Sequence, residues 1–382
     1  MTSRKRFSLR SLLFPVLAGA ALVAPAVTSG CGGGFDPISK VDGLRVLSVA
    51  VSRAPTTADP TTGGSYAHPD DEVTFEMTSY DGFVDPANPD APTRALQTVW
   101  LGGCYDPDGD AYYGCYASLG PIVGKLSAAL ADFNAGKPLV LPEEIGLGNS
   151  FTTKLPTDII SRRPTPVIGS HYGIAYVFFA TCAGFLGAAP QDSGGNAGSF
   201  PIACFADAKH TIRLGADSFV PGYTQIYVFE DGRVNADPSV KALMMNGKDP
   251  GDGPGNAISV PRCSVDDDTR TAPASCSKPD PFTTCTPVNI DIVADATVAD
   301  VDPEGMSVDG KPLKEVVWVD YFSDTGDFDS DVRLVNDATT GLIADHSTNW
   351  IAPTEPGLAS IWAVVHDARG GVTTLQRYIK VE

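Results

Sequence analysis

The sequence predicts a mainly β protein of two β-sandwich domains, the first of which carries a helical, disulfide-containing insertion. Three observations lead to this fold class. Turn-forming residues are abundant, with 39 Gly and 31 Pro in 382 residues. Many short segments alternate apolar and polar residues, as half-buried strands do. The order of these segments is repeated once along the chain, so we expect two similar units.

Ten segments have the length and alternation of strands. In residues 71–82, the apolar Val73, Phe75 and Met77 fall on one side of the predicted strand. Most of the segments are bounded by Asp, Gly or Pro, which favour turns. The ten expected strands are 43–55, 71–82, 96–104, 173–182, 223–232, 239–245, 287–295, 314–322, 359–367 and 373–382.

The first five segments and the last five form two weakly similar copies. Each copy has a Val-Trp pair in its middle strand, at Val99-Trp100 and Val317-Trp318. A tryptophan on a central strand that packs between two sheets is typical of immunoglobulin-like (Ig-like) sandwiches. We therefore expect two Ig-like domains, residues 43–232 and 233–382.

Both copies contain insertions. In the first, CYDPDGDAYYGC is followed by residues 118–136, where apolar residues recur every three or four positions. This spacing predicts an amphipathic helix that ends at Gly136 and has an apolar face formed by Ile122, Leu126, Leu130 and Phe133. The second insertion, residues 247–285, is poor in apolar residues and is expected to depend on cross-links for order.

Disulfides are the expected state of the cysteines if the protein is exported to an oxidising compartment. A Cys104–Cys115 bond would close a short loop, and a Cys104–Cys182 bond between neighbouring strands is the alternative. The spacings do not match those of zinc sites. The disulfide candidates are Cys104, Cys115, Cys182, Cys204, Cys263, Cys276 and Cys285.

Residues 1–30 have the form of a secretory signal. Four basic residues in the first ten precede an uncharged apolar run at 11–27. The run contains two prolines and is shorter than the roughly 20 residues of a spanning helix. Ala24-Pro25-Ala26 has the small residues of an ordinary cleavage site, which would release a soluble secreted protein.

The alternative cleavage point precedes Cys31. The segment Thr28-Ser29-Gly30-Cys31 resembles the lipobox of bacterial lipoproteins, although Thr28 stands where that family prefers leucine. The resemblance implies that Cys31 is the lipid attachment site, and Gly32 after it implies the outer membrane. Residues 31–42, with three successive glycines, are then expected to form a flexible tether.

A second resemblance concerns the C-terminal domain. The segment NWIAPTEPGLASIWAVVHDARGGV, residues 349–372, resembles PKD-like and other bacterial Ig-like domains. Together with the lipobox, residues 35–47 and the W-x-G-G-C strand, it gives the whole chain a layout similar to a group of uncharacterised bacterial lipoproteins. This resemblance implies an architecture but no activity.

The charge of the chain limits its partners. The formal charge of −19 becomes −23 once residues 1–30, with four basic and no acidic residues, are removed. Nucleic acids and anionic lipid surfaces bind through positive charge, so neither is an expected partner.

Two acidic segments raise the question of calcium. Asp106, Asp108 and Asp110 alternate inside the Cys104–Cys115 loop, but the glycine and glutamate positions of an EF-hand are not matched. A stapled polar turn is the favoured interpretation. Solvated loop acids are likewise favoured over weak calcium binding for Asp324, Asp327, Asp329 and Asp331 and for 266–268. No metal or cofactor site is predicted.

Three tyrosines of the same loop, Tyr112, Tyr113 and Tyr116, are candidates for binding, since tyrosine offers apolar area with a polar tip. The alternative is that they cover the inserted helix. The five histidines form no HExxH motif, and no G-x-S-x-G, P-loop or GxGxxG segment occurs.

The sequence therefore predicts a lipid-anchored cell-envelope protein that is not an enzyme and needs no cofactor. It would act as a binding or structural module, attached to the membrane through its lipid and able to take a protein or glycan ligand. Two alternatives stay open. One is a secreted hydrolase whose site is built from the insertions of the first domain, and the other is a calcium-dependent adhesion module.

Overall fold

The structure is a computed structural model, and it describes residues 38–53, 64–85, 87–88, 93–134, 138, 140–189, 202–266 and 281–382. It confirms a mainly β, sandwich-like protein with a small helical insertion. All ten expected strands form. Cys31, Cys276 and the proposed signal segment lie outside the described residues.

The first sandwich, domain 1, has two sheets. The first sheet has the order β1 (Leu44–Arg53), β3 (Glu72–Asp81) and β6 (Ser150–Lys154). The second has the order β2 (Tyr66–Ala67), β10 (Phe219–Phe229), β7 (Tyr172–Cys182), β4 (Gln97–Tyr105) and β5 (Ile145–Leu147). A small separate hairpin joins β8 (Phe185–Ala188) to β9 (Ile202–Phe205).

The second sandwich, domain 2, repeats this plan. One sheet has the order β11 (Val240–Met245), β13 (Val288–Ala294), β20 (Thr348–Ile351) and β17 (Asp327–Phe328). The other runs β12 (Ile258–Val260), β22 (Val372–Val381), β21 (Gly357–Asp367), β16 (Val317–Ser323), β18 (Val332–Asp337) and β19 (Gly341–Leu342). A hairpin of β14 (Val301–Met306) and β15 (Pro312–Lys314) projects from it, and a short helix, α3, spans Pro281–Thr284.

The strand orders show that the duplication extends to topology. The order β1-β3-β6 matches β11-β13-β20, and β10-β7-β4 matches β22-β21-β16. Even a small detail recurs, because β2 and β12 each pair in parallel with the last strand of their sandwich. The alternation of apolar residues was therefore sufficient to predict both copies.

The Val-Trp pairs, however, do not occupy equivalent positions. Trp100 is fully buried between the sheets of domain 1, as expected. The same expectation is wrong for Trp318, which faces outward on β16 and stacks on His366 at 5.3 Å. Neighbouring strand residues point to opposite faces, so a one-residue offset between the copies reverses the side chain. The buried tryptophan of domain 2 is Trp350, on β20.

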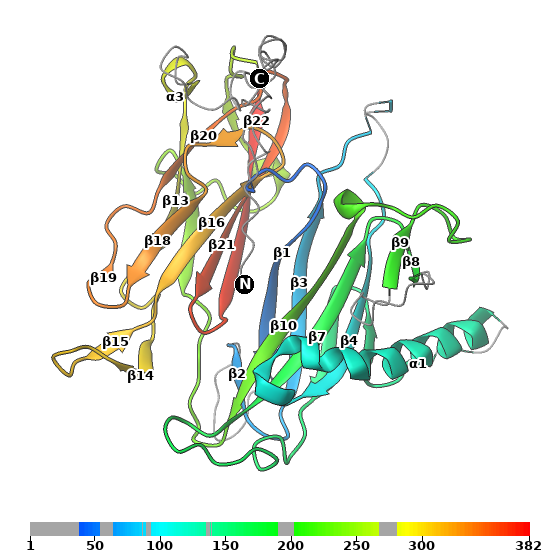
Figure 1. Ribbon diagram of the computed structural model, residues 1–382. Helices are drawn as coiled ribbons and strands as arrows, with labels where there is room; N and C mark the ends of the chain where they lie inside the picture. The colour runs from blue at the N-terminus through cyan, green and yellow to red at the C-terminus, as the bar shows by residue number, and fades with distance from the viewer. Residues whose placement is uncertain are drawn as a thin grey trace, which may run out of the picture.

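The four large sheets and α1 (Tyr116–Asn134) form one continuous stack (Figure 1). Successive apolar clusters hold it together. One lies between the sheets of domain 2, one between the two domains, one between the sheets of domain 1, and one between the second sheet of domain 1 and α1. The two sandwiches thus pack face to face rather than following each other as separate beads.

The contact between the domains is apolar at its centre. Trp362 of β21 packs on Tyr80 of β3 with ring centroids 4.7 Å apart, and Leu47 projects from a bulge in β1. Polar bonds surround this centre: the Tyr80 hydroxyl donates to Asp324 Oδ2 at 2.9 Å. The strand patterns of the sequence do not predict this interface.

The end of the predicted 31–42 tether also joins this interface. Val41 N donates to Ser323 O at 2.8 Å, and Ser323 N donates to Ser39 O at 2.9 Å. Val41 is fully buried. Residues 39–41 therefore extend the ladder beside β16 instead of forming loose chain.

The described cysteines form three disulfides, Cys104–Cys115, Cys182–Cys204 and Cys263–Cys285. The alternative Cys104–Cys182 bond does not form. The inserted helix follows the first disulfide and buries Ile122 and Leu126 against the second sheet of domain 1. Its described part reaches Asn134; the expected end at Gly136 and the side chains of Leu130 and Phe133 lie outside the described set. Within the described residues no helix is long and apolar enough to span a membrane.

Candidate functional site

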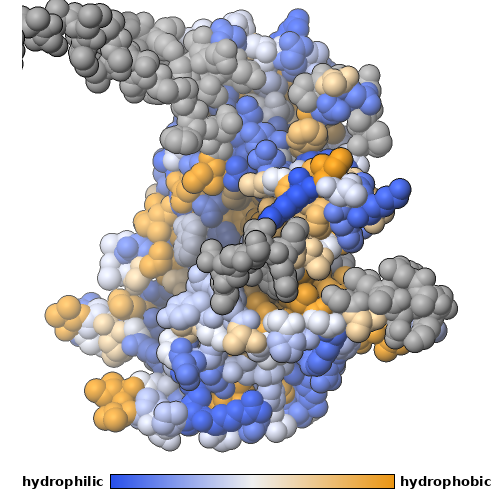
Figure 2. Space-filling view, turned by 45° about the vertical axis from the view of Figure 1, so that its right-hand side comes forward, coloured by the Kyte–Doolittle hydropathy of each residue, from blue (hydrophilic) through white to orange (hydrophobic). Residues whose placement is uncertain are grey.

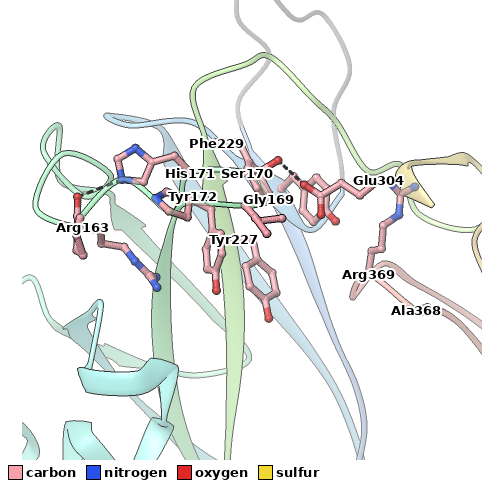
Figure 3. Close-up of a pocket in the computed structure, with 14 residues that line it drawn as sticks. Arg163, Gly169, Ser170, His171, Tyr172, Tyr227, Phe229, Glu304, Ala368 and Arg369 are labelled. Atoms are coloured by element: carbon pink, nitrogen blue, oxygen red, sulfur yellow. Dashed lines mark hydrogen bonds between the residues drawn. The ribbon is translucent and has the colours of Figure 1, made fainter. Parts of the chain in front are cut away.

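A cleft of about 560 Å³ lies between the two domains, where β10 ends and β7 begins (Figure 3). Domain 1 supplies one side through β2, β7, β10 and the loop 163–171. Domain 2 supplies the other through Glu304 of β14 and the β21–β22 turn at Ala368 and Arg369. The cleft is therefore a product of the domain packing and exists in neither sandwich alone.

Four aromatic rings form the domain 1 wall of the cleft. The strand register places Tyr66 beside Tyr227 and Phe229 beside Tyr172. The rings consequently gather, with centroids 5.5 Å apart for Tyr172 and Tyr227 and 4.9 Å apart for Tyr66 and Phe229. In Figure 3, Tyr172 and Tyr227 project side by side, with Arg163 on one side and Arg369 on the other.

Each of three guanidinium groups covers one of these rings. Arg163 lies 4.4 Å from the centroid of Tyr172, and Arg233 lies 4.3 Å from that of Phe229. Arg369 lies 5.6 Å from the centroid of Tyr66. Such cation–π contacts stabilise a charge near an aromatic face.

The same three cations are neutralised by carboxylates of the protein. Arg163 contacts Asp110 at 2.8 Å, and Arg369 contacts Glu315 at 2.7 Å. Arg233 contacts Glu304 at 2.9 Å. These three arginines, of which Arg163 and Arg369 line the cleft, thus form internal ion pairs.

Asp110 and Tyr172 have complementary protonation states. Burial alone would raise the pKa of Asp110, but hydrogen bonds from Arg163 and Tyr172 outweigh it and hold the pKa below its ordinary value. The pKa of Tyr172 is raised, chiefly because its hydroxyl donates to Asp110, at 2.6 Å. Asp110 is therefore an ionised acceptor and Tyr172 a neutral donor.

This network assigns the acidic loop 106–110 a structural role. Asp106 accepts a hydrogen bond from Ile174 N at 2.8 Å and contacts Arg163 at 3.3 Å. Among the described residues, no three His, Cys, Asp or Glu side chains gather in a way that could hold a metal ion. In the second acidic loop, Asp324 and Asp329 accept bonds from Ser360 N and Asn349 Nδ2; residues 267–268 are not described.

A polar strap crosses one end of the cleft. The Ser170 hydroxyl donates to Glu304 Oε1, and Arg233 Nη2 donates to Ser170 Oγ at 2.6 Å. The bond from Ser170, and a second one that Arg233 Nη1 donates to Glu304 Oε1 at 2.9 Å, lower the pKa of Glu304. The strap ties the 163–171 loop of domain 1 to the β14–β15 hairpin of domain 2.

The aromatic wall continues out of the cleft along β10. Tyr223, Gln225 and Tyr227 alternate with residues such as Ile226 and Val228 that enter the core between the sheets. Tyr223 is 43% exposed, and its ring stacks on Tyr112 with centroids 4.3 Å apart. We call the row formed by Tyr112, Tyr172, Tyr176, Tyr223 and Tyr227 the aromatic stripe.

The stripe shows where the sequence-predicted tyrosines lie. Tyr112 belongs to it, and Tyr113 beside it is 66% exposed. Tyr116, the first residue of α1, contacts Tyr112 and packs against Phe178 of β7. Sequence reasoning missed Tyr223 and Tyr227, although their two-residue alternation with Ile226 and Val228 carried the signal.

The described histidine rings are not paired with a serine or cysteine that they could activate as a nucleophile. In the cleft, His171 Nε2 faces the carbonyl oxygen of Arg163 at 3.1 Å, while Ser170 bonds to Glu304. His346 and His366 pair with Asp291 and Asp320 in domain 2. No described histidine ring hydrogen-bonds to a described serine or cysteine side chain.

The cleft lies far from the point where the described chain begins. Gly43, just before β1, packs against Asp217, which precedes β10. The cleft residues Tyr227 and Phe229 stand at the other end of this 11-residue strand. At about 3.3 Å per residue, the two points are roughly 35 Å apart.

The rim of the cleft includes an exposed apolar tip. Val167 and Ile168 are 100% and 90% exposed. Figure 2 shows several separate apolar groups on one face of the molecule, with hydrophilic surface between them. Neither a protein-family model nor a curated protein matches this chain.

Proposed function

We propose that the protein is a lipid-anchored cell-envelope protein whose two Ig-like sandwiches form one rigid, non-catalytic binding module. The observation that carries this proposal is the interdomain cleft. Its wall is aromatic, the three arginines that cover its rings are paired internally, and it is formed by two domains that pack through a continuous apolar contact. Preformed concave sites that combine aromatic side chains with a small number of placed polar groups are typical of ligand binding.

Two features support the cell-envelope assignment. Three disulfides in the described chain are typical of an oxidising compartment outside the cytoplasm. The basic and apolar segments before Cys31 have the order of a lipoprotein signal. The shared order of strands in both sandwiches supports the Ig-like assignment.

The position of the cleft supports its exposure to a ligand. Cys31 lies seven residues before Ile38, a chain length that spans at most about 25 Å. A lipid on Cys31 would hold the start of β1 near the membrane, whereas the cleft lies at the other end of domain 1. The anchored protein would therefore present the cleft away from its own attachment point.

Lipid attachment is tested by intact-mass spectrometry of the protein purified from its own envelope. The proposal predicts a chain that begins at Cys31 and carries added acyl mass. The variant Cys31→Ser should lack that mass and leave the membrane fraction. A chain that begins at Val27 without added mass would contradict anchoring.

Ligand binding and the absence of catalysis are tested together by calorimetry with purified envelope polysaccharides and peptides, followed by mass analysis of each compound. The proposal predicts that at least one compound binds, that Tyr227→Ala weakens its binding and that the compound is recovered unchanged. Tyr378→Ala is the control, because Tyr378 lies half-buried on β22, the counterpart of β10. Conversion of a compound into product would contradict a non-catalytic role.

A further inference from the structure

We infer that the ligand of the cleft is an uncharged, chain-like glycan that continues out of the cleft along the aromatic stripe. This inference rests on the proposed binding function and adds the class of ligand. Its motivating observation is the continuity between the cleft and the exposed tyrosines of β10.

The length of the stripe favours a chain over a compact molecule. Tyr223 and Tyr227 are four residues apart on the same face of β10, which corresponds to about 13 Å. Tyr112 stacks on Tyr223, and Tyr113 contacts Tyr112, so the aromatic surface widens at Tyr223. A ligand that contacts Tyr227 in the cleft and Tyr223 outside it must therefore be extended.

The charges around the stripe favour an uncharged ligand. Arg163, Arg233 and Arg369 are each paired with carboxylates, and the whole chain carries a formal charge of −19. An anionic chain would find no unneutralised cation in the cleft and would be repelled at longer range. The protein's own guanidinium groups already cover the faces of Tyr66, Tyr172 and Phe229, so we expect a ligand to contact the rings of Tyr223 and Tyr227 instead.

The chemistry of the stripe suits a sugar ring. The face of an aromatic ring carries partial negative charge, so it attracts the C–H groups on the apolar face of a sugar. Hydroxyl groups at the sugar edge need hydrogen-bonding partners, which the Tyr hydroxyls, Gln225 and the ionised Asp110 can provide. Gln225 Nε2 already lies 3.3 Å from the Tyr227 hydroxyl, so these groups form one polar border.

An extended peptide is the competing ligand, and the edge of β10 disfavours it. In the described chain no strand pairs with the outer edge of β10 before Tyr227. A peptide added there would need backbone donors, and Pro221 has none. Proline on an edge strand is a common device that prevents strand addition.

The test is calorimetry with neutral linear oligosaccharides of the α-glucan, β-glucan and chitin series, each from two to seven units. We expect one series to bind with an affinity that rises with chain length and then levels off. Tyr223→Ala and Tyr227→Ala should each weaken binding of the longest member about tenfold. Tyr223→Phe keeps the ring and should retain most of the affinity, while Tyr378→Ala should match wild type.

The outcomes separate the two proposals. If no series binds at millimolar concentration but a peptide binds in a manner that depends on Tyr227, the glycan inference is wrong and the cleft remains the binding site. If a glycan binds with an affinity independent of chain length, or equally well to Tyr223→Ala, the stripe is not its path. If no ligand depends on Tyr227, both proposals fail. Tyr223 is 43% exposed, so its variants should fold normally, and circular dichroism checks this.

Discussion

The two sandwiches share one strand order but use the same face in opposite ways. In domain 2, the outer face of β22, β21 and β16 is closed, because Trp362, Val364 and Phe322 pack against domain 1. In domain 1, the corresponding face of β10, β7 and β4 is covered by α1 on one half only. The other half carries Tyr223 and Tyr227.

The two faces occupy the same place in the strand order, so their different use depends on their side chains. Trp362 and Val364 are buried by 98% or more, as expected of an internal contact. The tyrosines of β10 combine apolar rings with hydroxyl tips, which suits a surface that alternates between water and a ligand. An inserted helix and a disulfide fix how much of the domain 1 face stays open.

The largest effect should come from opening the closed face. Trp362→Ala removes a buried ring that packs on Tyr80, and we expect a loss of about 3–5 kcal/mol in unfolding free energy. Because this ring lies between the domains, denaturant unfolding should also change from one transition to two. The measurement is urea unfolding followed by fluorescence and circular dichroism.

Trp318→Ala is the matched control for this prediction. Trp318 lies on the outer face of β16 but stacks only partly buried on His366. Its loss should cost less than about 1 kcal/mol. Equal losses for the two variants would mean that the closed face does not hold the domains together.

The next largest loss of stability should come from loosening α1, which covers half of the domain 1 face. The double substitution Cys104→Ser and Cys115→Ser removes a cross-link that closes a loop with a sequence separation of 11. The chain-entropy model predicts a loss of about 3 kcal/mol for a loop of this size. Amide hydrogen exchange should rise in α1 and β4 while domain 2 stays protected; a uniform rise in both domains would contradict a local role.

The smallest effect concerns the pH dependence of the closed face. Burial raises the pKa of Asp324 above its ordinary value, against hydrogen bonds from Ser360 and Tyr80 that lower it. The folded state therefore binds this proton more tightly than the unfolded state does. The resulting stabilisation is complete below the ordinary Asp pKa of about 3.9 and is lost as pH rises through the folded pKa.

Asp324→Asn should consequently flatten the dependence of stability on pH. Wild-type stability should decline relative to the variant as pH rises from about 4 through the folded pKa. Thermal unfolding of both proteins across this range is the measurement. Parallel curves for the two proteins would show that Asp324 does not titrate differently on folding.

Local patterns predicted the strands and the inserted helix because each depends on residues close in sequence. They could not place Trp318, since a Val-Trp pair does not state which face of a strand enters the core. The interface is reflected in the sequence of β21. This strand has apolar residues at neighbouring positions such as Ile361 and Trp362, as well as at Ala359, which is typical of strands buried on both faces. The cleft left no such trace in the sequence, because Tyr66, Tyr172 and Tyr227 come together only when three strands from distant segments pair, and Arg369 joins them only when both domains pack.

Hydroxyl-radical footprinting of the native protein, read out by mass spectrometry, tests directly whether the outer face of β22, β21 and β16 is closed and the face of β10, β7 and β4 is half open. We expect fast labelling of Tyr113 and Tyr223, which are exposed, and slow labelling of Trp362, which is buried. Addition of a bound neutral oligosaccharide should then protect Tyr223 and Tyr227 without changing Trp318. Labelling of Trp362 as fast as that of Tyr113, or protection of neither stripe tyrosine, would contradict a closed face in domain 2 and a half-open face in domain 1.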